Sequence, residues 1–382
     1  MIKKRLFTPG PTELHPRVVQ AMTAPILNHR KEEFKALLSK TRAQLQALCK
    51  TTGPVVILAA SGTGGLESAV LAAVASGEKM LVINAGKFGQ RFTEIAKAQD
   101  RVAIEVKAEW GQTIAASEVE KALKADGAIR AVCVQGSETS TATQHDIEAI
   151  AKVVKNFPDC LLIVDGITAL GCQPVNMDGW GIDLLIGGSQ KAFMLPPGLA
   201  FVAIGAKARA RVEASAKAGY YLNLGKELKK QEAGETAYTP AITLVMGLSV
   251  ALDILLENGP DDFVNNAHLQ AEMARAAAPA LGLELFSSNP ADSCTAFRIP
   301  DAIGAGPVVK KLQEEFGLYI AGGQDQLKGK IIRIAHLGYY DAFDTIGALA
   351  ALEMTLHRLG HTVTLGAAAA AAQKRYLDLR TK

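Results

Sequence analysis

The chain has 382 residues, enough for two domains of ordinary size, and its 49% hydrophobic content is typical of a globular protein with a large core. The formal net charge of +3 is small and the charges are evenly spread, which argues against a nucleic-acid-binding surface. We identify no apolar signal segment and no apolar run long enough to span a bilayer.

Seven short apolar runs in the first two-thirds of the chain predict β-strands. They are rich in Val, Ile and Leu and lack polar alternation, so both faces of their sheet should be covered. Helical patterns between several of them predict a mostly parallel α/β sheet with helices on both sides. The strand runs are 55–60, 80–85, 102–106, 131–135, 160–165, 182–187 and 199–205, and the helical patterns are 32–50, 66–75, 88–99, 116–126 and 145–157.

The last third of the chain has a different pattern. A long helix is predicted over 243–259, and Asn258, Gly259 and Pro260 then mark a boundary. Further helices (263–281, 307–317, 343–359 and an Ala-rich tail) and short strands (near 283–287, 294–299 and 331–335) predict a smaller α+β domain. We therefore expect an N-terminal arm (1–17), a large domain (18–258) and a small C-terminal domain (259–382).

Cysteine usage predicts the compartment. None of the five cysteines forms a Cys-x-x-Cys pair, and two of them lie inside predicted strands. We therefore expect buried free thiols rather than disulfides or a zinc site, and a cytoplasmic protein without a metal. The cysteines are residues 49, 133, 160, 172 and 294.

A glycine-rich turn, ASGTGGLESA (60–69), follows the first predicted strand of the sheet and begins a helix. Free backbone N–H groups at a helix N-terminus attract anions, and the hydroxyls of Ser61 and Thr63 beside Gly62 add donors. The turn therefore suits a phosphate, although a simple strand-to-helix turn with an N-cap hydroxyl explains it equally well. Because the turn is neither a P-loop nor GxGxxG, ATP and NAD are disfavoured.

Two charged residues lie at the ends of neighbouring predicted strands. Asp165 ends the run CLLIVD, and Lys191 follows the run IDLLIG. Ligands of open α/β sheets bind outside the carboxyl ends of the strands, so both side chains should lie at one edge. Each has an ordinary alternative, an Asx-turn for Asp165 and a lysine that reaches solvent for Lys191. Together with a phosphate site, however, an acid and a lysine are what pyridoxal phosphate requires.

Several motifs occur in the order and at about the spacing of one known family. SGTGGLE, VDGITALG, GGSQKAF-LPPG and RIAHLGY, with the opening FTPGPTELHP, resemble the class V aminotransferases across nearly the whole chain. The alanine/serine–glyoxylate (serine–pyruvate) aminotransferase group is the most similar. The resemblance implies a fold-type I pyridoxal phosphate transferase with a seven-stranded, mostly parallel sheet and a smaller C-terminal α+β domain.

The resemblance also implies site roles, position by position. Lys191 resembles the lysine that forms the internal aldimine and shuttles the proton, and Asp165 resembles the partner of the pyridine nitrogen. Arg333, in IIRIAHLGYY, resembles the arginine that binds the substrate α-carboxylate, for which a planar guanidinium is well suited. The implied cofactor contacts are Ser61, Gly62, Thr63 and Gln190 at the phosphate, Phe88 stacked on the ring and Thr139 at the ring hydroxyl.

The loop GETAYTPA (234–241) resembles a segment that reaches the phosphate of the neighbouring subunit. Thr236 or Thr239 would make that contact, and the enzyme would then be a homodimer with shared active sites. The motif containing Thr139 departs from the family in one respect, because relatives often have glycine where this chain has Ala142.

The expected function is pyridoxal phosphate-dependent transamination between alanine or serine and glyoxylate or pyruvate, by a ping-pong mechanism through a Lys191 aldimine. Partners other than these small molecules and a second copy of the chain are not expected. Alternatives are 2-aminoethylphosphonate, phosphoserine or aspartate transamination, for which Arg30 is an additional cation, and a cofactor-binding protein without turnover. A cysteine desulfurase is disfavoured, because Gln190 replaces the usual histidine and 300–335 contains no cysteine.

Overall fold

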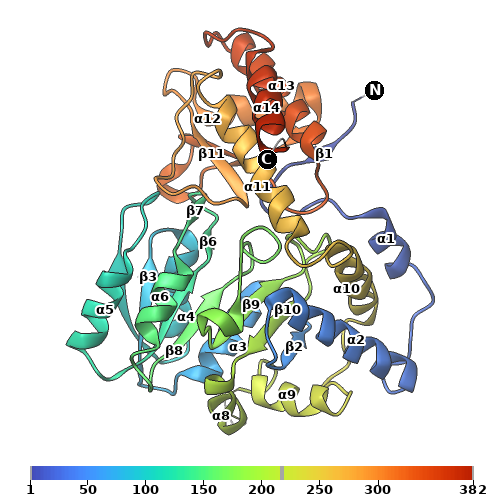
Figure 1. The fold of residues 1–382 in the computed structure, drawn as a ribbon, viewed down its shortest axis with the longest axis vertical. Helices are drawn as coiled ribbons and strands as arrows, with labels where there is room; N and C mark the ends of the chain where they lie inside the picture. Colours follow the sequence, from blue (N-terminus) through green and yellow to red (C-terminus); the bar gives the residue numbers. More distant parts are fainter. Residues whose placement is uncertain (1, 216–218, 381–382) are drawn as a thin grey trace.

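The structure is a computed structural model that describes residues 2–215 and 219–380. Figure 1 shows a broad lower part built around a large sheet and a narrower upper part formed by the C-terminal segments. The first residues of the chain also lie against the upper part, so both ends of the described chain contribute to it.

All seven predicted strands of the first two-thirds form one sheet, in the order β2-β10-β9-β8-β5-β3-β4. Every pairing is parallel except the two made by β10, which confirms the expected mostly parallel sheet. Their bounds are Val55–Leu58 (β2), Lys79–Asn84 (β3), Val102–Lys107 (β4), Ile129–Gln135 (β5), Leu161–Asp165 (β8), Leu184–Gly188 (β9) and Ala200–Ile204 (β10).

Both faces of this sheet are buried, which explains the absence of polar alternation. Along β2, Val55 and Ile57 pack into one apolar cluster, whereas Val56 and Leu58 pack into another on the opposite face. The first cluster includes side chains of α2 (Glu32–Cys49), α5 (Ala116–Ala125), α6 (Ile147–Val154) and α10 (Ile242–Leu255). The second includes side chains of α3 (Gly62–Ala73), α4 (Lys87–Ala98), α8 (Ala206–Ala214) and α9 (Leu224–Glu232).

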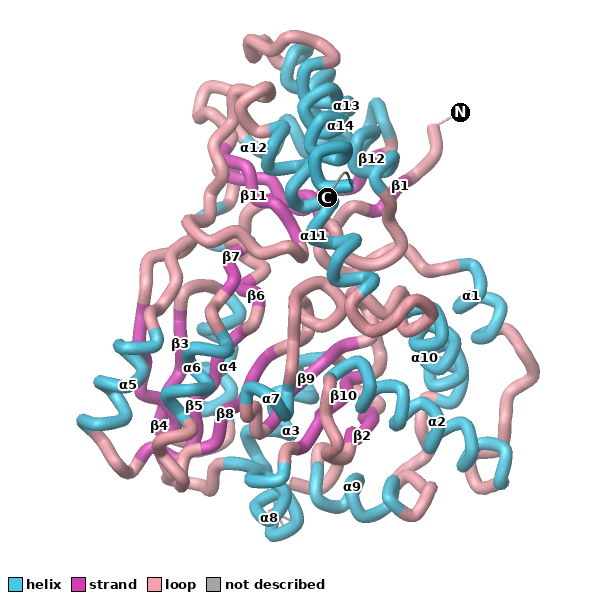
Figure 2. The backbone as a smooth tube through the Cα atoms, in the orientation of Figure 1, coloured by secondary structure: helices cyan, strands magenta, loops and turns pink. Residues whose placement is uncertain are grey.

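The upper part holds a three-stranded antiparallel sheet, in the order β11-β14-β13, with helices packed against it (Figure 2). Its strands are Cys294–Arg298 (β11), Ala321–Gly322 (β13) and Ile331–Ala335 (β14). Its helices are Asp262–Ala277 (α11), Ala305–Phe316 (α12), Ala342–Arg358 (α13) and Ala367–Arg380 (α14). The predicted strand near 283–287 is wrong, because the segment makes only an isolated bridge between Leu285 and Phe297.

The remaining elements are short. They are β1 (Arg5–Leu6), α1 (Pro16–Met22), the β6 (Ser137–Glu138) and β7 (Thr143–Gln144) hairpin, α7 (Met177–Trp180), β12 (Leu318–Tyr319) and a 3₁₀ turn (Asp325–Leu327). β1 pairs in parallel with β12, so the arm belongs structurally with the C-terminal part of the chain. The exact domain limits, 1–17, 18–258 and 259–382, stay a prediction.

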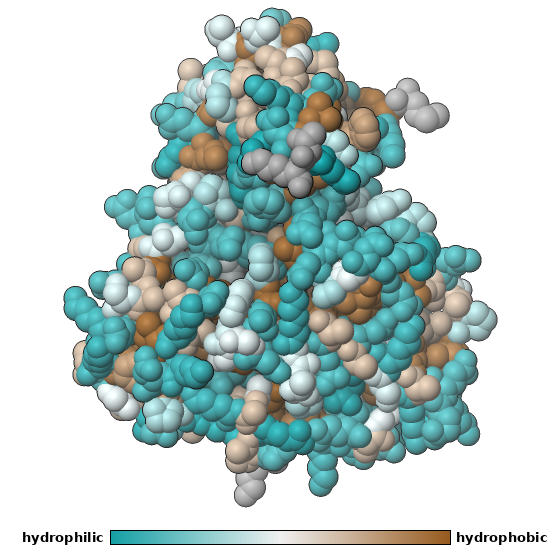
Figure 3. Space-filling model, viewed as in Figure 1, coloured by the Kyte–Doolittle hydropathy of each residue, from teal (hydrophilic) through white to brown (hydrophobic). Residues whose placement is uncertain are grey.

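The face shown in Figure 3 is mostly hydrophilic, with apolar side chains in small separate groups. Within residues 2–215 and 219–380, no helix combines the length and apolarity that crossing a membrane requires. The same residues contain no group of three or more His, Cys, Asp or Glu side chains placed to hold a metal ion.

Candidate active site

The predicted site residues converge because several loops leave the large sheet at one edge. β8 and β9 are parallel neighbours, so Asp165 at the end of β8 and Lys191 just beyond β9 emerge on the same side. β2 also runs in this direction, since β10 is antiparallel to both β2 and β9. The glycine-rich turn after β2 therefore joins the same edge.

The turn Ser61–Thr63 forms the N-terminus of α3. Ser61 is the N-cap residue, but its side chain makes no capping hydrogen bond. A Cβ built on Gly188 would lie 3.7 Å from the Gly62 Cα and 3.4 Å from Gln190 Oε1, so the turn adjoins Gln190. Gln190 Oε1 is buried without a hydrogen-bond partner. Free first-turn N–H groups and two hydroxyls are donors that suit a phosphate, and Gln190 could add only the N–H groups of its Nε2, since Oε1 is an acceptor.

Asp165 is 5% exposed, and its Oδ1 accepts a hydrogen bond from the Ile167 N–H at 2.9 Å. Burial raises the pKa of this carboxyl to about 6, against the opposing effects of the Ile167 hydrogen bond and the charges of Arg91 and Lys191. No hydrogen bond within the described chain reaches Oδ2, so this oxygen is available to a cationic ring nitrogen.

Lys191 is 9% exposed, and its Nζ donates a hydrogen bond to the Pro9 carbonyl at 2.5 Å. Burial lowers the pKa of the amine to about 8; Asp165 opposes this effect and Arg333 adds to it. A neutral amine is the nucleophilic and basic form, so a substantial fraction of Lys191 is competent near pH 8. The sequence does not predict the contact with Pro9.

Arg333 lies on β14 and is 5% exposed. Its Nε and Nη2 donate to the Gly322 carbonyl at 3.2 and 2.8 Å, and its Nη1 donates to the Thr139 carbonyl at 2.7 Å. A guanidinium has five N–H groups, so one remains on each terminal nitrogen. These two parallel donors can bind a carboxylate, while the main-chain bonds fix the plane of the fork.

The Glu138 carboxylate, to which the sequence assigns no role, connects the start of α4 at Phe88 with the segment that contains Thr139. Glu138 is fully buried, and its Oε2 accepts the Phe88 N–H at 3.0 Å and the Gly89 N–H at 2.9 Å, at the start of α4. Its Oε1 accepts from the backbone and hydroxyl of Ser140. Burial raises the pKa of the Glu138 carboxyl. In the sequence, the one feature that could have drawn attention to Glu138 is its charge within the otherwise neutral run GSETSTA.

The Thr139 hydroxyl lies 2.6 Å from that of Thr168, in the loop that follows Asp165. The sequence gives Thr168 no role, because a threonine beyond a strand end has no distinguishing pattern. Ala142 ends this motif with φ of +55°, the left-handed region that glycine adopts at lower cost.

Thr236 and Thr239 lie beside the end of β2, next to the segment that leads into the Ser61 turn. They line a small cavity together with Ile57–Ala59 and Tyr221, and Thr236 Oγ1 donates to the Tyr238 carbonyl at 2.6 Å. No hydrogen bond within the described chain joins either threonine to Lys191 or to the Ser61 turn. Their expected contact with a neighbouring subunit's phosphate stays a prediction.

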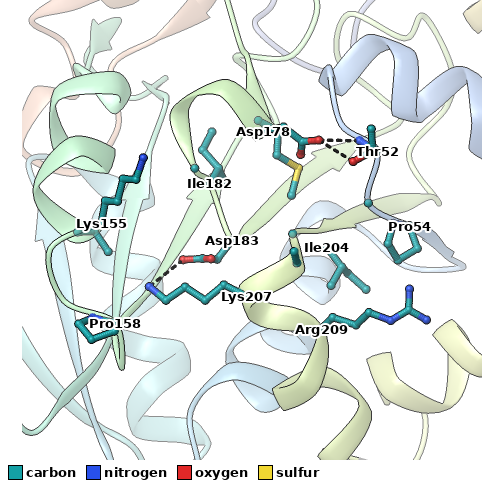
Figure 4. A pocket seen from close by; sticks show the side chains of 16 residues that line it. Thr52, Pro54, Lys155, Pro158, Asp178, Ile182, Asp183, Ile204, Lys207 and Arg209 are labelled. Atoms are coloured by element: carbon teal, nitrogen blue, oxygen red, sulfur yellow. Dashed lines mark hydrogen bonds and ion pairs between the residues drawn. The ribbon is translucent and has the colours of Figure 1, made fainter.

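A cavity of about 760 Å³ lies at the opposite edge of the sheet, beside the start of β9 (Figure 4). Its charged groups are largely satisfied by protein partners: Asp178 accepts from Thr52, and Lys207 Nζ lies 3.7 Å from Asp183. Arg209 pairs with Glu213 and Glu232 on the surface. Parallel α/β sheets bind ligands at the carboxyl edge, so this cavity is not the expected active site.

The residues present at the carboxyl edge fit pyridoxal phosphate. They supply an anion cradle at the α3 N-terminus, where the Ser61 hydroxyl makes no capping bond, a buried carboxylate at Asp165 and a buried amine at Lys191. Phe88 is half-buried at the start of α4, and the Arg91 guanidinium lies 4.7 Å from its ring centroid. Stacking of the Phe88 ring on the cofactor ring stays a prediction.

The Asp165 pKa predicts a pH dependence of cofactor binding. Above about pH 6 the carboxylate is anionic and can pair with a cationic ring nitrogen, whereas below it a proton competes for the same oxygen. We expect the dissociation constant for pyridoxal phosphate to rise about tenfold per pH unit below 6. Absorbance titrations of wild type and Asp165→Asn between pH 5 and 8 test this. An equal slope in both proteins would assign the effect to the phosphate group instead.

Comparisons with known proteins agree with this site. The chain matches the family model described as aminotransferase class-V over residues 6–338. It is 36% identical, over 97% of its length and 98% of the relative's, to a Synechococcus protein described as the small subunit of a soluble hydrogenase. It is 32% identical to an L-aspartate–glyoxylate aminotransferase of Paracoccus denitrificans (97% and 96% covered) and to a serine–glyoxylate aminotransferase of Methylorubrum extorquens (97% and 95% covered).

Solved structures show the same similarity. The pyridoxamine–pyruvate aminotransferase of Mesorhizobium loti superposes with a TM-score of 0.94 at 25% identity, over 100% of this chain and 98% of that one. An aspartate aminotransferase of Thermus thermophilus superposes with a TM-score of 0.87 at 33% identity, over 93% and 100%. The fold is thus that of the fold-type I enzymes, and the cofactor is pyridoxal phosphate. The chain belongs to the class V aminotransferase family.

Proposed function

We propose that this enzyme transfers the amino group of a small amino acid, alanine or serine, to glyoxylate or pyruvate in two half-reactions. The observation that carries the proposal is that the Lys191 amine lies within electrostatic reach of both the Asp165 carboxylate and the Arg333 guanidinium, which keeps one N–H on each terminal nitrogen. Relatives named for glyoxylate support the choice of acceptor.

When bound, pyridoxal phosphate supplies a carbonyl carbon that takes the amino group and a ring that stabilises negative charge at the substrate Cα. Ser61–Thr63 and Gln190 would hold its phosphate, and Asp165 its ring nitrogen. Arg333 binds the substrate α-carboxylate through two N–H groups and so orients the Cα bonds. Lys191 Nζ, buried and partly neutral near pH 8, takes and returns the proton at Cα.

The main chain of the N-terminal arm supports a small substrate. The Pro9 carbonyl lies 2.5 Å from Lys191 Nζ, so the arm occupies space beside the reacting amine. Aspartate is the second candidate donor, because a relative and a solved neighbour are named for it. The phosphonate and phosphoserine alternatives require a second cation, and Arg30, the one suggested by the sequence, is exposed.

A donor and acceptor panel tests the substrate proposal. Alanine, serine, aspartate, phosphoserine and 2-aminoethylphosphonate should be assayed against glyoxylate, pyruvate and 2-oxoglutarate. We expect the highest kcat/KM for alanine or serine with glyoxylate or pyruvate. A tenfold preference for aspartate, phosphoserine or 2-aminoethylphosphonate would contradict the proposal and leave the aminotransferase assignment intact.

We also propose a homodimer with shared sites and a cytoplasmic location. Thr236 and Thr239 support the dimer, because their loop resembles a segment that reaches the neighbouring subunit's phosphate and neither hydroxyl bonds to Lys191 or to the Ser61 turn in the described chain. The five free, buried cysteines support a reducing compartment. Sedimentation of the purified protein tests the dimer.

A further inference from the structure

The N-terminal arm segment Phe7–Thr12 connects the strand that carries Arg333 with the main chain and amine of Lys191. We propose that this segment is a positioning element that orients the Lys191 amine, when the amine carries no cofactor, through the Pro9 carbonyl. The proposal rests on the proposed function, since it assumes that Lys191 is the catalytic amine. It adds residues to which the sequence assigns no role.

Three hydrogen bonds join the arm to the lysine and its neighbour. Lys191 Nζ donates to the Pro9 carbonyl at 2.5 Å. Thr12 Oγ1 donates to the Lys191 carbonyl at 2.8 Å, and the Thr12 N–H donates to the Gln190 carbonyl at 3.2 Å. Both the main chain and the tip of the lysine are therefore held by the same short segment.

Gly10 provides the close approach. A Cβ at this position would lie 2.2 Å from Lys191 Nζ and 2.7 Å from its Cδ and Cε, so any side chain would displace the amine. Gly10 also has φ of +127°, which L-residues rarely adopt. Glycine is thus required both by the backbone conformation and by the space that Lys191 fills.

The other end of the segment is anchored beside Arg333. The Phe7 carbonyl accepts the Ala335 N–H at 3.0 Å, two residues beyond Arg333 on β14. The Phe7 ring is 1% exposed and stacks on Tyr340 with centroids 4.6 Å apart. The Phe7 N–H also bonds to the Tyr319 carbonyl at 2.7 Å. Six residues therefore connect the carboxylate-binding strand to the amine, which fixes one relative to the other.

The bond to the Pro9 carbonyl fixes the direction in which the Lys191 amine points. A neutral amine that donates one N–H to the Pro9 carbonyl keeps its lone pair free and pointed away from that oxygen. General-base efficiency depends on this geometry, so loosening the arm should slow proton transfer more than substrate binding.

Thr12→Val and Gly10→Ala test the proposal, with Thr41→Val as a matched control outside the arm. Thr12→Val removes the hydroxyl bond to the Lys191 carbonyl at 2.8 Å, whereas Thr41→Val removes a hydroxyl bond of the same length, to the Leu37 carbonyl within α2. We expect the donor half-reaction, followed by stopped-flow absorbance, to slow about tenfold in Thr12→Val with KM within twofold. Gly10→Ala should slow it about 100-fold, and Thr41→Val less than twofold.

A second readout uses the cofactor-free protein. Reductive methylation of Lys191 at pH 8, measured by peptide mass spectrometry, should be about fivefold faster in Thr12→Val. The arm then loses its hydroxyl bond to the Lys191 main chain and covers the amine less tightly. Thr41→Val should match wild type. If Gly10→Ala does not fold, Thr12→Val decides alone. Wild-type rates in Thr12→Val by both readouts would overturn the proposal, whereas retained activity in Lys191→Ala would instead overturn the proposed function.

Discussion

Replacement of Lys191 by alanine is expected to lower kcat by about 10⁴-fold or more. The variant loses the general base at the substrate Cα, which typically contributes about 10²–10⁴-fold, and also the amine that attaches the cofactor. Ser61–Thr63, Gln190 and Asp165 remain, so pyridoxal phosphate should still bind, without a covalent link. Single-turnover kinetics with alanine or serine measures the loss.

Borohydride treatment separates covalent from non-covalent binding. In wild type it should fix the cofactor to the peptide that contains Lys191, which mass spectrometry detects. Lys191→Ala should show no such mass increase, and Lys310→Ala, which alters an exposed lysine, should behave as wild type. A label on another lysine, or more than about 1% residual turnover, would contradict the role of Lys191.

Replacement of Arg333 by lysine is expected to lower kcat/KM for the amino donor about 100-fold. The substitution keeps the charge but removes the fork, and two hydrogen bonds to a carboxylate are each worth about 1.5 kcal/mol. It also removes the bonds that join β14 to Thr139 and to Gly322. The visible absorbance of the bound cofactor should change little, because Arg333 is assigned to the substrate.

Arg298→Lys is the matched control for this prediction. Arg298 lies on the neighbouring strand β11, is exposed, and has its guanidinium 4.4 Å from the Phe286 ring centroid. We expect its kcat/KM to stay within twofold of wild type. Equal losses in the two variants would indicate damage to the small sheet and would refute carboxylate binding by Arg333.

The large sheet could be predicted from sequence because its physical signal is local. Alternate residues of β2 enter two different cores, so Val55 and Val56 are both apolar, and the same holds for the central strands β5 and β8. Lys191 and Asp165 were predicted at one edge for the same reason, since parallel strands end together. The prediction of a strand near 283–287 was wrong. A short apolar run does not specify a partner strand, and the segment forms only the bridge between Leu285 and Phe297.

The contacts around the predicted residues could not be derived from sequence. Pro9 and Lys191 are far apart along the chain, and no periodicity relates them. In the sequence Glu138 is an isolated acidic residue among small polar ones. Only the folded chain shows that its carboxylate accepts hydrogen bonds from the first N–H groups of α4. Such bonds depend on tertiary placement, which residue spacing does not encode.

The pairing of β1 with β12 has a consequence for how the protein is made. Arg5 pairs with Leu318 and Leu6 with Tyr319, so the first strand to leave the ribosome waits for almost the whole chain before it finds its partner. Closing so long a loop is entropically costly and is repaid only when the C-terminal strands have formed. During synthesis the arm segment Phe7–Thr12 therefore cannot take its place beside Lys191 through this pairing until Leu318 and Tyr319 have been made.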